Sequence, residues 1–189
     1  MTLEAFLHRV VTLLEDLGIP YMLTGSIAAA YYAEPRATRD IDLVIEVSSE
    51  EIGALLERLD AEGWYVSHEA AREALEGQGQ FNAVDPASGW KVDWLIRKDR
   101  PFSRTEFGRR RRVRLADLDV PLVTAEDLIV AKLEWARRGS SELQLRDALA
   151  ILLQRGGELD RGHIERWAED LGIEREWRAM LEAAAGEEG

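Results

Sequence analysis

Residues 38–47 read TRDIDLVIEV, and this stretch decides the fold of the 189-residue chain. One face of residues 40–47 is apolar throughout (Ile41, Leu43, Ile45, Val47) and the other carries Asp40, Asp42, Val44 and Glu46, which predicts a β-strand with one buried face. Asp40 and Asp42 are two residues apart, so their side chains point to the same face of that strand. Two carboxylates placed this way repel each other unless one is protonated or a cation bridges them. The pattern indicates either a solvated strand face or a site for a divalent cation.

A second signal lies upstream, at residues 24–29, which read TGSIAA. The apolar run before it, residues 21–23, predicts a buried strand, and the alanine-rich residues 27–33 after it predict a helix. Gly25 allows the backbone to approach a ligand closely, and the first amides of a helix attract anions. Ser26 has a simpler alternative role as the cap of that helix. The turn is therefore a candidate phosphate-binding site.

A third carboxylate follows in a predicted hairpin. Residues 81–84 and 90–96 form its two strands, and residues 85–89, DPASG, have the composition of a turn. Asp93 interrupts the second strand on the face opposite to its apolar residues. Its simpler interpretation is an exposed aspartate on an edge strand, and its functional interpretation is a third metal ligand.

Helical periodicity returns elsewhere along the chain and dominates after residue 124. We predict an α/β (α+β) fold in which a mixed β-sheet flanked by helices, residues 1–123, is followed by a C-terminal helical region, residues 124–189, packed on that core. A capping box at Ser48 and Glu51 marks the start of one helix. The expected helices are 3–17, 50–62, 69–75, 125–137, 142–154, 161–171 and 174–185, and further short strands are expected at 113–115 and 120–123.

Composition limits the chemistry. The chain has no cysteine, so a metal must be held by carboxylates and possibly histidine, which favours Mg²⁺ or Mn²⁺. The charged N-terminal segment 3–17 is neither a signal-peptide core nor a membrane span, so we expect a cytoplasmic protein without a membrane partner. The net charge of −12 argues against broad binding to DNA or anionic membranes.

Taken together, these motifs resemble the nucleotidyltransferase superfamily typified by DNA polymerase beta. The family's Gly-Ser turn, Asp-x-Asp strand and later acid are matched by Gly25-Ser26, Asp40-Ile41-Asp42 and Asp93. The wording TGSIAA…RATRDIDLVIEV is most similar to the AbiEii and MenT group, the nucleotidyltransferase toxins of bacterial toxin–antitoxin and phage-defence systems. The resemblance implies transfer of a nucleotidyl group from a nucleoside triphosphate to a hydroxyl. It also implies Mg²⁺ or Mn²⁺ held by the three aspartates, and nucleotide phosphates held at Gly25 and Ser26.

The resemblance extends into the helical region. VTAEDLIVAKLEWA, residues 123–136, is similar to the family's segment that carries a functional lysine. Lys132 lies on a predicted apolar helix face, where a charge needs a partner, and Asp147 follows on the next helix. The resemblance implies a catalytic and nucleotide-binding Lys132 and a nucleotide-binding Asp147. The alternative is a buried ion pair between neighbouring helices, and both interpretations can hold together.

Arginines supply further candidates. Arg36 and Arg39 precede the Asp-x-Asp motif; we predict that Arg39 contacts the triphosphate, although it could equally pair with a carboxylate. Residues 97–114 hold nine of the 24 basic side chains, and the run Arg109–Arg112 suits RNA phosphates or, more simply, a solvated strand.

The acceptor stays open at this point. It could be an RNA 3′ end such as that of tRNA, a protein hydroxyl or a small molecule. A competing class is a non-catalytic module that binds a nucleotide or a cognate toxin or antitoxin protein while keeping the fold.

Overall fold

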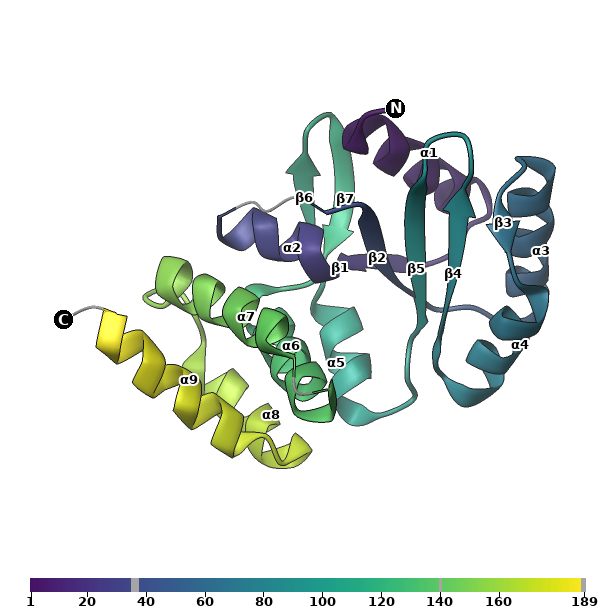
Figure 1. Cartoon of the computed structure of the whole chain (residues 1–189). Coiled ribbons are helices and arrows are strands. Elements are labelled where there is room, and N and C mark those ends of the chain that lie inside the picture. The colour runs from purple at the N-terminus through teal and green to yellow at the C-terminus, as the bar shows by residue number, and fades with distance from the viewer. Residues whose placement is uncertain (35–37, 140, 188–189) are drawn as a thin grey trace. The chain divides into compact units, whose positions relative to one another are not determined.

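The strand predicted at residues 40–47 is β2 (Asp40–Ile45), the central strand of a seven-stranded sheet. The computed structural model describes residues 1–34, 38–139 and 141–187 of the chain. The other strands are β1 (Tyr21–Thr24), β3 (Tyr65–Val66), β4 (Gln80–Asp85), β5 (Trp90–Ile96), β6 (Arg111–Leu115) and β7 (Leu118–Leu122). They follow the order β3-β4-β5-β2-β1-β7-β6 across the sheet (Figure 1).

Helices account for most of the remaining chain. They are α1 (Leu3–Asp16), α2 (Gly25–Tyr32), α3 (Ser49–Ala61), α4 (His68–Gly77), α5 (Pro101–Arg109), α6 (Ala125–Gly139), α7 (Glu142–Arg155), α8 (Arg161–Leu171) and α9 (Glu174–Glu187). Contacts between residues divide the chain into two units. The first contains the sheet with α1, α3, α4 and α5, and the second contains α6 to α9 with the part of α2 from Ala28 onward. The packing of residues 124–189 on the core stays a prediction.

The sheet is mixed, as predicted. Strand β2 runs antiparallel to β1 and parallel to β5, and β5 in turn runs antiparallel to β4. Because β5 lies between β2 and β4, Asp93 is on an interior strand. The interpretation of Asp93 as an edge-strand residue is therefore wrong.

One face of this sheet is the core of the first unit. Ile41, Leu43 and Ile45 of β2 are fully buried on it. Trp94 of β5 is also fully buried and pairs in register with Leu43. Phe6 of α1 stacks on Trp90 of β5, at 5.7 Å between ring centroids. The apolar alternation therefore directs the other face of β2, with Asp40 and Asp42, away from this core.

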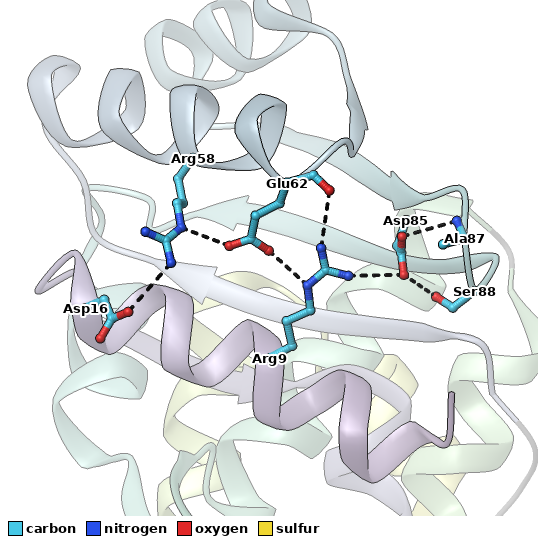
Figure 2. A network of polar contacts seen from close by, with 7 residues as sticks. All are labelled: Arg9, Asp16, Arg58, Glu62, Asp85, Ala87 and Ser88. Carbon is cyan, nitrogen blue, oxygen red and sulfur yellow. Dashed lines mark hydrogen bonds and ion pairs between the residues drawn. The ribbon is translucent and has the colours of Figure 1, made fainter.

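A network of ion pairs fastens α1 to the sheet (Figure 2). The guanidinium of Arg9 contacts Glu62 at the end of α3 at 2.9 Å and the buried Asp85 at the end of β4 at 3.3 Å. Arg58 approaches the other oxygen of Glu62, also at 2.9 Å. Burial alone would raise the pKa of Glu62, but the hydrogen bonds from Arg58 and Arg9 outweigh it and hold that pKa below its ordinary value. The network positions the β4–β5 turn.

One predicted helix start is confirmed, and two short elements were not predicted. The capping box is confirmed: the Glu51 amide donates to the Ser48 hydroxyl, and the Ser48 amide donates to the Glu51 carboxylate. Helix α5 was not predicted. Its only strong signal is Pro101 at the first helical position, because its buried positions include Ser103 and Glu106 and its apolar periodicity is weak. The two-residue strand β3 was also missed.

The second unit is built on apolar helix faces and one buried polar cluster. Asp127 of α6 is fully buried, accepts from the Thr124 hydroxyl at 2.7 Å, and lies 2.6 Å from the ring of His163 on α8. Arg137 donates to the carbonyl of Leu171 at the end of α8 at 3.0 Å. In the described part of the chain, no helix is long and apolar enough to cross a lipid bilayer.

Candidate functional site

Strand register brings the three predicted aspartates together. In the parallel pair of β2 and β5, Asp40 lies opposite Lys91 and Asp42 lies opposite Asp93. Neighbouring strands are about 4.8 Å apart and paired residues point to the same face, so Asp42 and Asp93 are direct neighbours. Asp40 lies two residues before Asp42 on β2, so its side chain is on the same face of the sheet. The structure thus juxtaposes acids that are separated by about fifty residues of sequence.

Gly25 and Ser26 lie against this acidic cluster. The backbone amide of Ser26 donates to Oδ2 of Asp42 at 3.3 Å. Gly25 has a φ of +63°, and a Cβ placed there would overlap the carboxylate of Asp42. Only glycine adopts this left-handed backbone without strain and also leaves room for the Asp42 carboxylate. Helix α2 begins at Gly25, and Ser26 lies in its first turn. The capping role of Ser26 stays an alternative.

We expect Gly25→Ala to destabilise the first unit and to displace Asp42. The left-handed backbone alone costs an alanine about 1–2 kcal/mol, and the overlap with Asp42 adds to that. Urea unfolding measures the loss. Gly18→Ala is the matched control, because Gly18 also has a positive φ, +66°, but nothing lies within 4 Å of its added Cβ. Equal losses in the two variants would show that Asp42 does not restrict position 25.

A lysine that sequence analysis did not select also belongs to the cluster. The ammonium Nζ of Lys91 is 2.9 Å from Oδ2 of Asp93 and 3.5 Å from Oδ2 of Asp40. Burial alone would lower the pKa of Lys91, but the hydrogen bond and charge of Asp93, helped by Asp40, raise it above its ordinary value. Its position two residues before Asp93 was the available signal, because residues i and i+2 of a strand share a face.

The site extends along the same row of the sheet. Thr24 of β1 pairs with Asp42, and Asn82 of β4 pairs with Asp93. Thr24 is buried, whereas Asn82 is exposed. Thr24 entered the prediction only as the first residue of the motif that contains Gly25 and Ser26. Asn82 was not predicted, because a single asparagine carries no pattern until its strand partners are known.

The donor set suits a hard divalent cation. Three carboxylates on one sheet face offer oxygen ligands, which Mg²⁺ and Mn²⁺ prefer. A positive group, the ammonium of Lys91, already bridges two of them, which shows that this position attracts a cation. Among the described residues, no three acidic or histidine side chains converge as they stand into a metal-binding group. The donor set therefore fits a hard divalent cation in charge and chemistry.

Lys132 and Asp147 lie in the second unit and contact each other. The Nζ of Lys132 is 2.9 Å from Oδ2 of Asp147 and 2.9 Å from Oε1 of Gln144. Their side chains are 4% and 7% exposed. The ion-pair interpretation thus describes the contact that is present, and the predicted role of both residues in nucleotide binding stays a prediction.

The arginines that were predicted to bind phosphates are described next to few groups of the acidic cluster. The side chain of Arg39 is exposed. Among the contacts that the structure describes, Arg39 meets β5 only through its backbone carbonyl, which accepts a hydrogen bond from the Lys91 amide at 3.3 Å. Arg36 lies outside the described residues. In the run Arg109–Arg112, Arg109 ends α5 and Arg110 follows it. Arg111 and Arg112 begin β6 at the sheet edge, where both are exposed. Triphosphate or RNA binding by these arginines stays a prediction.

Comparison of sequences finds no relatives. No protein-family model matches this chain, and no curated protein is significantly similar to it in sequence.

Comparison of structures is informative. The chain is similar to the solution structure of the antibiotic-resistance factor ANT(2'')-Ia, with 15% identity, a TM-score of 0.61, and 97% of this chain and 96% of that chain covered. The lincosamide antibiotic adenylyltransferase LnuA gives 12% identity and a TM-score of 0.53, with 77% and 93% covered. An antigenic nucleotidyltransferase-like protein from Paracoccidioides brasiliensis gives 16% identity and a TM-score of 0.57, with 93% and 88% covered.

These likenesses establish the fold. The chain has the nucleotidyltransferase fold, with a mixed sheet flanked by helices and helices at its C-terminal end. The predicted fold class is confirmed. The predicted closeness to the AbiEii and MenT toxins is not shown by these structures and stays a prediction.

Proposed function

We propose that this protein is a metal-dependent nucleotidyltransferase, which moves a nucleoside monophosphate from a nucleoside triphosphate to an acceptor hydroxyl. One observation carries the proposal. Asp42 and Asp93 are direct neighbours in register, Asp40 shares their face, and the Ser26 amide is directed at Asp42. The fold supports the same function, because one similar structure is described as a lincosamide antibiotic adenylyltransferase and another as a complex with adenylyl-2''-tobramycin.

The proposed reaction balances as a single displacement. The acceptor oxygen forms a bond to the α-phosphorus of the triphosphate while the bond to the bridging β-phosphate oxygen breaks, and pyrophosphate leaves. Asp40, Asp42 and Asp93 would hold Mg²⁺ or Mn²⁺, which when bound neutralises charge on the phosphate oxygens and favours ionisation of the acceptor hydroxyl.

The chain's own groups have distinct roles in this proposal. Asp93 is the candidate to accept the proton of the acceptor hydroxyl, because it is a carboxylate with 19% of its side chain exposed beside the exposed Asn82. The Ser26 amide, at the start of α2, is the candidate donor to a phosphate oxygen. Gly25 leaves the space in which these groups meet. Lys132, Asp147 and Arg39 are proposed as further nucleotide-binding residues on the family resemblance alone.

Charge favours a small cationic acceptor over RNA. The chain carries a net charge of −12, which repels a polyanion and attracts a polyamine. A similar structure is described in complex with adenylyl-2''-tobramycin and another with lincomycin bound. A tRNA acceptor and a role as a toxin or antitoxin rest on the sequence resemblance only, and we treat them as other outcomes of the test.

Labelled nucleotide transfer tests the proposal. The purified chain is incubated with Mg²⁺ or Mn²⁺ and each α-labelled nucleoside triphosphate, together with an aminoglycoside panel, a lincosamide or total cellular RNA. We expect label to appear on a small molecule, and none to appear when the metal is chelated. In parallel, the matching triphosphate with metal is expected to stabilise the fold by about 2.7 kcal/mol at a hundredfold excess over its Kd.

Each result has a distinct meaning. Label on RNA or on the protein itself would keep the activity and change the acceptor. Stabilisation by a triphosphate without transfer to any acceptor would favour the non-catalytic nucleotide-binding module. Neither stabilisation nor transfer with any triphosphate would overturn the proposed function.

A further inference from the structure

We infer that Lys91 is an internal counter-cation of the acidic site, one that pairs with Asp93 and Asp40 and must be displaced from them when a metal ion binds. Lys91 would therefore set the metal affinity of the protein. The inference rests on the proposed function, because it concerns the metal site which that function needs.

The placement of Lys91 is fixed by the sheet. It lies two residues before Asp93 on β5 and pairs in register with Asp40 on β2. Its side chain therefore rises on the same face as all three aspartates. From there its Nζ lies 2.9 Å from Oδ2 of Asp93 and 3.5 Å from Oδ2 of Asp40. One ammonium group thus approaches carboxylates from two different strands, which is the arrangement expected of a bound cation.

Electrostatics explain why a positive group is needed there. Three carboxylates on one sheet face repel one another, and the partly buried Asp93 is screened by water less than an exposed group. The ammonium of Lys91 offsets one of these charges and lets the carboxylates of Asp93 and Asp40 lie close together. The site is thereby preorganised for a cation before any metal arrives.

The same contact opposes metal binding. Asp93 is one of the carboxylates that would hold the metal, and its Oδ2 accepts from Lys91, so the ammonium and a metal ion would compete for this carboxylate. The flexible four-carbon stem of lysine allows its ammonium to withdraw, and the Lys91 side chain is 32% exposed to solvent. Metal affinity is therefore reduced by the strength of the ion pairs that are broken, roughly three- to tenfold for partly exposed pairs.

Metal titration of a lysine variant tests the inference. Mn²⁺ binding to the full chain without nucleotide is measured by isothermal titration calorimetry for the wild type and Lys91→Met, which keeps an unbranched side chain of similar length and removes the charge. We expect the Kd of Lys91→Met to be roughly three- to tenfold lower. Arg104→Met is the control, because it removes an exposed positive charge whose described ion pair is with Asp99, and it should leave the Kd unchanged. Lys91→Arg retains the charge and should bind Mn²⁺ about as weakly as the wild type.

A second readout requires no metal. In the presence of a chelator, Lys91→Met should unfold at a lower temperature than the wild type, because its carboxylates then repel one another without compensation. Saturating Mn²⁺ should remove that difference. If Lys91→Met does not fold, Lys91→Gln provides the same comparison with a neutral polar side chain.

The outcomes separate this inference from the proposed function. Equal or weaker Mn²⁺ binding by Lys91→Met, with normal binding by the wild type, would overturn the inference and leave the proposed function intact. Absence of Mn²⁺ binding in every variant, including the wild type, would overturn the metal site and the inference with it.

Discussion

Asp42→Asn should abolish nucleotidyl transfer while the protein stays folded. Asp42 is the residue where the elements of the site meet, because it pairs with Asp93, accepts from the Ser26 amide and fills the space left by Gly25. Removing its charge removes a metal ligand, and metal-ion stabilisation of a phosphoryl transition state is worth several kcal/mol. We expect the rate with labelled triphosphate to fall by on the order of a thousandfold.

The fold should tolerate this change. Asparagine keeps the oxygen that accepts from the Ser26 amide, and loss of the charge relieves repulsion by Asp40 and Asp93. The free energy of unfolding should therefore change by less than about 0.5 kcal/mol. Glu46→Gln is the matched control, because Glu46 directly follows β2 and pairs with Arg97 away from the cluster. Retained turnover in Asp42→Asn would rule out the assignment of Asp42.

Lys132→Met should produce the largest loss of stability. It leaves Asp147 charged and buried, with 7% of its side chain exposed and its ion-pair partner gone. Removing one partner of a buried ion pair typically costs about 3–5 kcal/mol. For a chain of this size that corresponds to a fall in melting temperature of roughly 6–20 °C, which circular dichroism would detect.

A double variant separates the two interpretations of Lys132. Lys132→Met combined with Asp147→Leu removes both charges and should recover most of the lost stability, because apolar replacements of buried ion pairs are often neutral. If the refolded double variant still gains stability from triphosphate and metal as the wild type does, Lys132 and Asp147 serve only the fold. If Lys132→Met alone were as stable as the wild type, the buried pair would not contribute as described.

The strands and helices with a strong period could be predicted from the sequence. Alternation in DIDLVI and the turn residues after Val84 predicted β2 and the β4–β5 hairpin, because one buried face imposes a period of two. The same logic placed Asp40 and Asp42 on one face. Helix α5 escaped prediction, since its buried face includes polar residues and its apolar period is weak.

The juxtaposition within the site could not be derived from local pattern alone. The sequence of residues 90–96 does not predict that β5 pairs in parallel with β2 and places Asp93 beside Asp42, because strand order depends on the whole sheet. The family resemblance supplied only the expectation that Asp93 joins Asp40 and Asp42, without the strand pairing that achieves it. Lys91 was missed for the same reason: its significance comes from Asp40, its partner across the strands.

The arginines of β6 have a consequence for how copies of this protein meet. An edge strand offers unpaired backbone groups that a second chain can extend into a shared sheet, and charged side chains are a common defence against such addition. At one edge, Arg111, Arg112 and Arg114 are exposed along β6. The opposite edge, β3, is only two residues long. Both edges of the sheet are thus poor templates for intermolecular β-pairing. The exposed arginines of β6 would therefore help to prevent aggregation, a role that requires no nucleic acid.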